Sequence, residues 1–169
     1  TAITIPESVT SIEESAFSGC SSLTAINIPE SVTSIGDYAF RDCSNLTAIT
    51  IPESVTSIGY YTFDGCSSLE RVTINCANVG SWFSGLSSLK EIVLGESVTS
   101  IGEGAFSGCS SLERVTINCA NVGSWFSGLS SLKEIVLGEG VTSIGESAFN
   151  GCSSLTAVHI SSLEVWCNI

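Results

Sequence analysis

The residues best suited to chemistry in this chain are eight cysteines, one histidine and many serines. Paired cysteines could form disulfides or bind zinc, and a serine beside a histidine could act as a nucleophile. No two cysteines have C-x-x-C spacing, His159 is the only histidine, and the serines fall in repeated turns with no base to activate them. We therefore predict no catalytic residue, no metal site and no cofactor, and expect that the protein is not an enzyme.

Five cysteines recur at one position of a repeated pattern, three residues before a leucine: Cys20, Cys43, Cys66, Cys109 and Cys152. Two shorter copies carry Leu86 and Leu129 at this position, so the position is apolar. Its thiols are expected to be buried and unpaired, with disulfides as the less favoured alternative. Cys76 and Cys119 instead follow a predicted strand, and we expect them nearer the surface and too far apart for a bridge.

These positions belong to an internal repeat that runs through the whole chain. Proline and cysteine first recur every 23 residues, and cysteine later recurs every 43 residues, which is one unit of 23 plus one of 20. Such a period predicts a solenoid, because one copy cannot bury its apolar face without neighbours. We predict one repeat array over 1–169, with units 1–22, 23–45, 46–68, 69–88, 89–111, 112–131, 132–154 and a closing unit 155–169 in which Leu163 and Trp166 cover the last core layer.

The long units predict a fixed order of short elements, for which 46–68 serves as the example. Alternating β-branched residues predict a strand that Pro52 ends, because proline cannot donate to a strand ladder. A second extended segment ends at Gly59, and 60–66 suit a turn of helix. One phenylalanine falls in this last segment in each of the first seven units. Stacked units should therefore hold a column of phenylalanines in their interior.

The two 20-residue units, 69–88 and 112–131, keep the strand and shorten the other side. We expect Trp82 and Trp125 to fill the space left there, since an aromatic residue beside the phenylalanine column is typical of a core. The alternative is an aromatic contact for a sugar or a protein.

The repeated motif resembles the BspA-like class of leucine-rich repeats of bacterial and protist cell-surface proteins. It occurs as IPESVTSIGDYAFRDCSNL at 28–46, as IPESVTSIGYYTFDGCSSL at 51–69, and without the proline as GESVTSIGEGAFSGCSSL at 95–112. The resemblance implies a β-rich leucine-rich repeat solenoid. This would be a right-handed curved coil with a parallel sheet on the concave face and short strands or helical turns on the convex side. It also implies an exported or surface-attached protein used in adhesion and recognition.

Composition and charge limit the partners that this chain could bind. Apolar residues make up 43% of it, which favours a folded protein, and acids outnumber bases 17 to 5 for a net charge of −12. This sign disfavours nucleic acids and anionic membranes, because both require a basic surface. No apolar run reaches the length of a membrane span, so we predict no membrane insertion by this segment.

The outward positions of the predicted strands form columns along the array. Two columns alternate acids and bases, as in Glu70 followed by Lys90 and Arg71 followed by Glu91, which we interpret as cross-strand pairs that fix register. The next column is nearly uncharged and is our candidate partner-binding strip: Asn27, Thr50, Thr73, Val93, Thr116, Val136 and His159. Ordinary solvated sheet surface is the alternative.

The sequence thus favours a non-enzymatic recognition or adhesion module, extracellular or on the cell surface. Its expected partner is a protein or glycan on another cell surface, bound through the face of the solenoid. The alternative is a structural spacer or stalk with no ligand of its own. The near-identical copies 69–111 and 112–154 favour a spacer somewhat, since a specific site usually needs non-identical neighbours.

Overall fold

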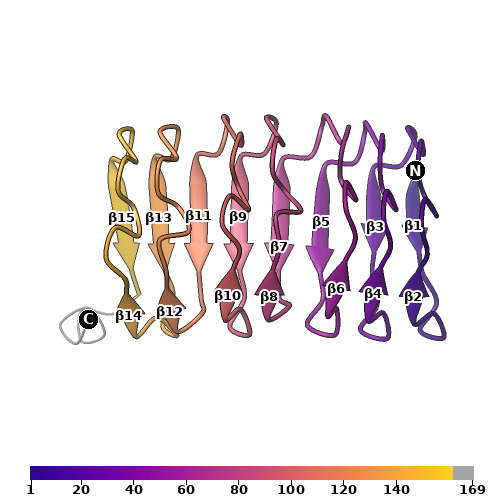
Figure 1. Cartoon of the computed structure of the whole chain (residues 1–169), viewed down its shortest axis with the longest axis horizontal. Helices are drawn as coiled ribbons and strands as arrows, with labels where there is room; N and C mark the ends of the chain where they lie inside the picture. The colour runs from indigo at the N-terminus through magenta and orange to yellow at the C-terminus, as the bar shows by residue number, and fades with distance from the viewer. Residues whose placement is uncertain (162–169) are drawn as a thin grey trace.

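The computed structural model describes residues 1–161, which form one continuous solenoid (Figure 1). Its main element is a parallel sheet of eight strands, to which each turn of the chain adds one strand. In order along both sheet and chain these are β1 (Ala2–Thr4), β3 (Ala25–Asn27), β5 (Ala48–Ile51), β7 (Arg71–Ile74), β9 (Glu91–Leu94), β11 (Arg114–Ile117), β13 (Glu134–Leu137) and β15 (Ala157–Ile160). Equivalent residues pair directly, such as Ile49 with Val72 and Val72 with Ile92.

The strands of this sheet alternate between core and solvent, because successive side chains of a strand point to opposite faces. In β5, Ile49 and Ile51 are buried while Ala48 and Thr50 are exposed. The strand ends immediately before Pro52, which confirms the predicted strand and its end.

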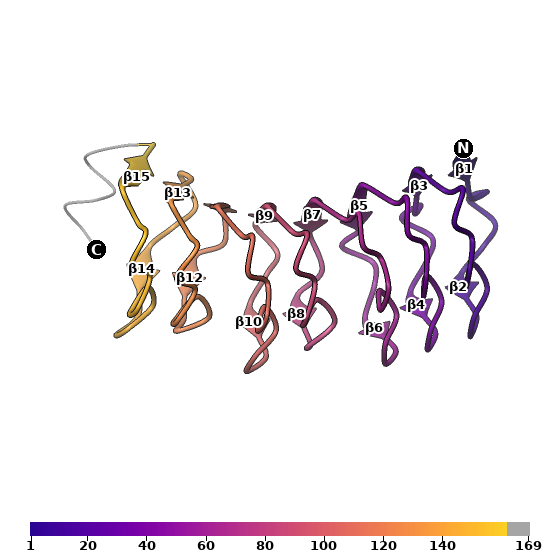
Figure 2. The same cartoon turned by 90° about the horizontal axis from the view of Figure 1, so that it is seen from above.

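A second set of strands, each of two residues, runs along the opposite side of the array. They are β2 (Ser11–Ile12), β4 (Ser34–Ile35), β6 (Ser57–Ile58), β8 (Asn78–Val79), β10 (Ser100–Ile101), β12 (Asn121–Val122) and β14 (Ser143–Ile144). Figure 2 shows a gentle curve, with the eight-stranded sheet on the concave side and the short strands on the convex side. The expected leucine-rich repeat solenoid with a concave parallel sheet is therefore confirmed.

The turn of helix expected at 60–66 is not formed, and residues 1–161 contain no helix. Each of these segments, called here a back turn, is a series of tight turns in which bonds span three residues, as from the Cys66 N–H to the Phe63 carbonyl (3.2 Å). Other N–H groups donate to the next unit: Tyr38 to Tyr60 (3.0 Å), Phe40 to Thr62 (3.0 Å) and Asp42 to Asp64 (2.8 Å). A helix would point these groups along its own axis, whereas the turns allow a second ladder between units.

The core consists of columns of equivalent side chains. Phenylalanine rings stack along the whole axis, with neighbouring centroids 5.2–6.4 Å apart: Phe17, Phe40, Phe63, Phe83, Phe106, Phe126 and Phe149. The five inner rings are at most 2% exposed, and the two end rings are half-buried. The predicted phenylalanine column is confirmed, and each unit depends on its neighbours to cover its ring.

The boundaries of the single repeat array remain a prediction, as does its closing unit. Leu163 and Trp166, expected to cover the last core layer, lie outside the described residues. Within residues 1–161 no helix is long and apolar enough to cross a membrane.

Candidate functional site

The two short units narrow the convex side of the solenoid and leave the concave sheet intact. Pairing of β8 with β10 aligns Asn78 with Ser100 and Val79 with Ile101. Compared with 46–68, the unit 69–88 therefore lacks two residues just after its strand and one residue just before Phe83. Nonetheless β7 pairs over its four residues with both neighbours.

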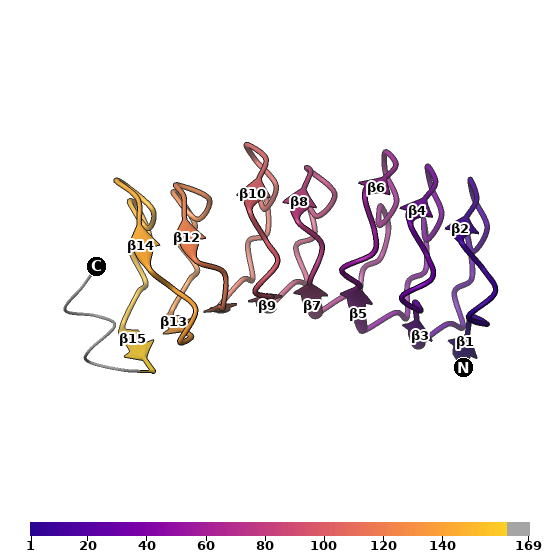
Figure 3. The same ribbon diagram turned by 90° about the horizontal axis from the view of Figure 1, so that it is seen from below.

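The convex ladder is interrupted wherever a long unit precedes a short one. The short strands fall into three groups, β2–β4–β6, β8–β10 and β12–β14, with breaks after β6 and β10 (Figure 3). In the described part of the chain, no backbone hydrogen bond joins the back turn 60–66 to 81–86, or 103–109 to 124–129. The missing bonds mark the two places where the convex side is open.

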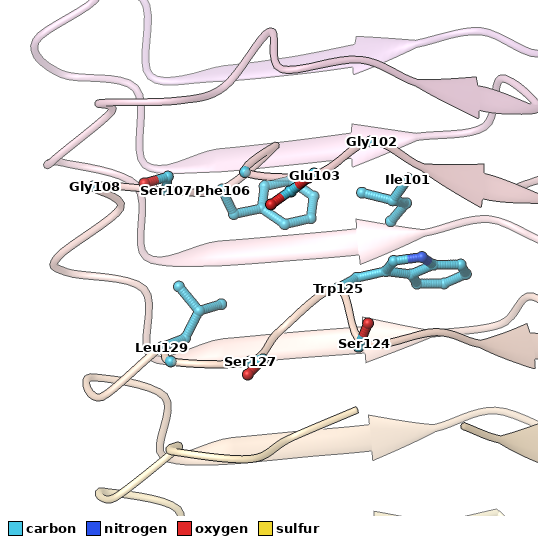
Figure 4. Close-up of a pocket in the computed structure, with 12 residues that line it drawn as sticks. Ile101, Gly102, Glu103, Phe106, Ser107, Gly108, Ser124, Trp125, Ser127 and Leu129 are labelled. Carbon is cyan, nitrogen blue, oxygen red and sulfur yellow. The ribbon is translucent and has the colours of Figure 1, made fainter. Parts of the chain in front are cut away.

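Each break contains a hollow. We call the hollow at the first break, of about 650 Å³, the first notch, and the hollow at the second break, of about 670 Å³, the second notch. The first notch is lined by Ile58, Gly59, Tyr60, Tyr61, Asp64, Gly80, Ser81, Trp82 and Ser84. The second notch is lined by Ile101, Gly102, Glu103, Gly104, Phe106, Ser107, Gly108, Ser124, Trp125, Ser127, Gly128 and Leu129. Figure 4 shows the second notch, with Trp125 beside Ile101 at one end and Leu129 at the other.

The tryptophans of the short units are attached to the core but do not close these notches. Trp82 packs edge-on against Phe83, with centroids 6.3 Å apart, and Trp125 is 6.5 Å from Phe126 in the same way. A Cβ atom at Gly80 would lie only 2.6 Å from Trp82 Nε1, so the indole fits because this residue is glycine. Both tryptophans stay partly exposed, so they fill space, as expected, and also line a hollow.

A cluster of tyrosines beside the first notch was missed by the sequence analysis. The rings of Tyr38 and Tyr61 stack with centroids 5.7 Å apart, and Tyr60 and Tyr61 are 78% and 65% exposed. The signal was present in the sequence, because the chain has only three tyrosines and all lie in this cluster. The two later long units have Glu103 and Gly104, and Glu146 and Ser147, at the positions of Tyr60 and Tyr61.

The cysteines of the main column are buried thiols, as predicted. Cys43, Cys66, Cys109 and Cys152 are at most 9% exposed, Cys20 at the end is half-buried, and no disulfide forms within residues 1–161. Each buried thiol donates to a phenylalanine carbonyl of the preceding unit, as Cys66 does to Phe40 at 3.2 Å. Burial raises the pKa of Cys43 to about 11 and that of Cys66 to about 12, so the nucleophilic thiolate is disfavoured.

Cys76 and Cys119 correct the sequence analysis, which expected them nearer the surface. Both are fully buried. The deletion after the strand removes the residues equivalent to Glu53 and Ser54, which moves Cys76 into the position of Val55 in the core. Burial raises the pKa of Cys76 to about 11 as well, so this thiol is also unreactive.

The charged columns on the concave face form ion pairs, which confirms their interpretation as cross-strand pairs. Lys90 contacts Glu70 at 2.7 Å and Lys133 contacts Glu113 at 2.7 Å, while Arg71 pairs with Glu91 and Arg114 lies 3.7 Å from Glu134. The hydrogen bond from Lys133, its charge and that of Lys90 lower the pKa of the Glu113 carboxyl. Exposed pairs of this kind fix register more than they stabilise the fold.

The candidate strip forms one column on the concave sheet. Register pairs Thr50 with Thr73 and continues strand by strand to His159, and Asn27 lies at the equivalent position of β3. Thr73, Val93, Thr116 and Val136 are half-buried, and Asn27, Thr50 and His159 are exposed. His159 Nε2 lies 3.1 Å from Glu134 Oε1, so this end of the strip also contacts the charged column. Binding through the strip remains a prediction.

No group of three or more His, Cys, Asp or Glu side chains in 1–161 is placed to hold a metal ion. The single imidazole contacts a carboxylate on the open concave face, while the serines and buried thiols lie elsewhere. This arrangement is that of a scaffold with exposed faces.

A β-solenoid of short stacked strands, with leucines and phenylalanines in fixed columns, defines a leucine-rich repeat protein. The family model of the BspA type leucine rich repeat region matches residues 1–82 and 79–166, in six copies. The chain belongs to this family, as the motif at 28–46 indicated.

Solved structures of similar proteins have the same fold. A leucine-rich repeat protein of T. pallidum (TpLRR) is 30% identical, with a TM-score of 0.64 over 92% of this chain and 78% of that one. A leucine-rich repeat protein of Bacteroides ovatus is 29% identical, with a TM-score of 0.63 over 93% of this chain and 48% of that one. The pneumococcal vaccine antigen PcpA is 19% identical, with a TM-score of 0.59 over 99% of this chain and 52% of that one. Comparison with curated proteins gives no match.

Proposed function

We propose that this chain is a non-enzymatic recognition module of an exported or cell-surface protein. It binds a protein or glycan on another cell surface through the concave face of the solenoid. The observation that carries this proposal is the candidate strip, an uncharged column beside charges that already neutralise one another, such as Glu70 with Lys90. A partner docking there desolvates few unpaired charges, which lowers the cost of binding. Membership of the BspA-type family supports the location outside the cell.

The strip provides affinity by many shallow contacts on a fixed surface. Except for His159 on the edge strand β15, its residues are held by strands that pair on both sides, so little conformational entropy is lost when a partner docks. Threonine hydroxyls such as those of Thr50 and Thr73 donate and accept hydrogen bonds, and the valine methyls supply apolar area. This chemistry suits an extended polypeptide or a glycan chain laid along the array.

The test is capture of partners by the immobilised chain, from cell-surface proteins and from a glycan array. The double variant Thr50→Arg/Thr116→Arg places two large charges on the strip, and we expect it to lower the retained amount at least tenfold. Ser107→Arg adds the same side chain to an exposed position on the convex side and should leave retention unchanged. Equal retention by all three proteins would refute the strip as the binding surface.

A spacer or stalk without a ligand is the second candidate function, favoured by the near-identity of 69–111 and 112–154. These copies differ at only three positions, Ser97/Gly140, Gly104/Ser147 and Ser107/Asn150. Identical turns build length and stiffness without creating a unique site. In the capture experiment a spacer retains neither proteins nor glycans, so the same measurement separates the two functions.

A further inference from the structure

The tyrosine cluster of the convex side (Tyr38, Tyr60 and Tyr61) has two features that are unfavourable for the stability of the folded state. First, Tyr60 and Tyr61 expose large rings to water. Second, Tyr38 and Tyr61 have positive φ values of 58° and 54°, a conformation that bulky L-residues rarely adopt. The equivalent residue of a later unit is Gly104, with φ of 70°, which suits this backbone without strain. The equivalent Ser15 and Ser147 have the same positive φ, so the backbone recurs along the array while the tyrosine rings do not. Apart from the stacking of Tyr38 on Tyr61, the fold gains little from these rings, which leaves them available to contact a ligand.

The rings adjoin a hollow that is open because the convex ladder stops there. Tyr60, Tyr61 and Asp64 line one side of the first notch, and Trp82 and Ser84 of the shortened unit line the other. Its volume of about 650 Å³ is sufficient for a large side chain and part of its backbone. The notch combines aromatic rings with one carboxylate.

The adjacent unit shows which ligand this combination accepts. The guanidinium carbon of Arg41 lies 5.6 Å from the centre of the Tyr38 ring. Arg41 Nε lies 3.5 Å from Asp42 Oδ2 and 3.7 Å from Asp64 Oδ2. Arg41 follows Tyr38 by three residues, as Asp64 follows Tyr61. Asp64 therefore stands where Tyr61 would need an arginine of its own unit, and the next unit has Ser84 at this position. The chain's other four basic residues are paired on the concave face.

We propose that the first notch binds an arginine or lysine side chain of a basic partner protein, in the way that Tyr38 and Asp64 already hold Arg41. The cation contacts the faces of Tyr61 and Trp82, and the Asp64 carboxylate, which it shares with Arg41, supplies the opposite charge. The net charge of −12 attracts basic partners over a longer range and repels acidic ones. The site lies on the face opposite the candidate strip and is independent of the function proposed above.

The second notch is a control built into the same molecule. It has the same tryptophan, as Trp125 (Figure 4). Its volume is similar, at about 670 Å³. Glu103, Gly104 and Ser107 replace Tyr60, Tyr61 and Asp64 there, so the tyrosine rings are absent and the carboxylate is that of Glu103, at a different position from Asp64. Binding should therefore occur at the first notch and not at the second.

The experiment is an NMR titration of the full chain with the peptide acetyl-Gly-Arg-Gly-Arg-Gly-amide. The probe's matched control has citrulline in place of arginine, which keeps the shape and removes the charge. We expect saturable shifts of the Tyr61 and Trp82 ring signals that weaken as salt is added, and no shift of Trp125. Citrulline should bind at least tenfold more weakly.

The matched variant is Tyr60→Glu/Tyr61→Gly, which gives the first notch the residues that the fold already accommodates at 103–104. It should lose at least tenfold in affinity while its melting temperature stays the same or rises. The reverse variant, Glu103→Tyr/Gly104→Tyr/Ser107→Asp, should shift the Trp125 signal upon titration. Equal binding of citrulline, unchanged binding by the first variant, or tighter saturation of the same rings by a neutral oligosaccharide would overturn the proposal.

Discussion

The first three units and the alternating units that follow share one concave sheet but differ on their convex side. In 1–68, every unit has 23 residues or nearly so, and the back turns are joined by hydrogen bonds such as Phe40 to Thr62. In 69–154, units of 20 and 23 residues alternate, and the convex ladder breaks wherever a long unit precedes a short one. The register of the concave sheet is therefore set by the strand segment of each unit alone. The number of residues in the rest of the unit decides whether the convex strands and back turns bond to the next unit.

Alkaline pH should cause the largest loss in the free energy of unfolding. It also tests whether a thiol of the short units is buried in the same way as a thiol of the first three units. The pKa of the Cys66 thiol is about 12 and that of Cys76 about 11, both above the ordinary value of 9.0. Between pH 9 and 11 the unfolded chain loses these protons first, so the free energy of unfolding falls as pH rises. Each buried thiol contributes up to about 1.4 kcal/mol per pH unit to the slope of the free energy of unfolding against pH.

Urea unfolding at pH 8, 9, 10 and 11 measures this slope. Cys66→Val and Cys76→Val should each reduce it by the contribution of one thiol, and by similar amounts. A Cys76→Val variant with the wild-type slope would contradict the burial of that residue in the short unit.

Removing a phenylalanine should have the next largest effect, and it distinguishes a closed region from an open one. Phe40→Ala should lower the free energy of unfolding by about 3–5 kcal/mol, because the ring is fully buried between two others. Phe106→Ala should cost less, since Phe106 borders the second notch and its surroundings can relax or admit water. Urea unfolding of both variants decides this, and a larger loss for Phe106→Ala would contradict an open convex side there.

A chimera should remove the difference between the two regions. Replacing 75–83 by the sequence of 52–63 restores the three missing residues and should allow the back turn 60–66 to donate to the next unit. At about 0.5–1.5 kcal/mol for each hydrogen bond, the expected gain in stability is about 1–3 kcal/mol after the cost of ordering the added chain. Replacing 118–126 by 95–106 is the matched change at the second notch. Loss of stability in both chimeras would show that length does not cause the breaks.

The smallest effect concerns the concave ion pairs, which are common to the alternating units. Lys133→Met removes the hydrogen bond and the charge that lower the pKa of Glu113, so this pKa should rise toward its ordinary value. Lys90→Met should raise it less, because Lys90 acts on Glu113 through its charge alone. Carboxyl carbon NMR titration measures both shifts. Any loss of stability in Lys133→Met should be present at pH 7 and should diminish as the pH falls below the ordinary pKa of Glu113, because the folded-state pKa is the lower one.

The sequence predicts those features that recur at a fixed period. The strand ending before Pro52, the phenylalanine column and the burial of Cys66 all follow from equivalent residues in successive units. The prediction that Cys76 lies nearer the surface was wrong, because three missing residues can be placed after the strand or before the phenylalanine. Pairing of β8 with β10 decides this, and a pairing depends on three-dimensional contacts between units.

The candidate sites show the same division between repeated and unrepeated features. The strip is a column of the repeat, so its alignment from Thr50 to His159 follows from register. The first notch results from a mismatch between neighbouring units, and no single unit contains it. Tyr60 and Tyr61 depart from the residues of later units, and such departures from a repeat are the signal that the sequence analysis should have followed.

Amide hydrogen exchange at the two kinds of junction tests the central claim most directly. Tyr38, Phe40 and Asp42 donate their N–H groups to the next unit, whereas the N–H groups of Tyr61, Phe63 and Gly65 face the first break and have no backbone acceptor in 81–86. The account predicts slow exchange for the first three amides and exchange at least tenfold faster for the second three. Equal protection of all six would show that the convex ladder continues into the short unit, and would contradict the account.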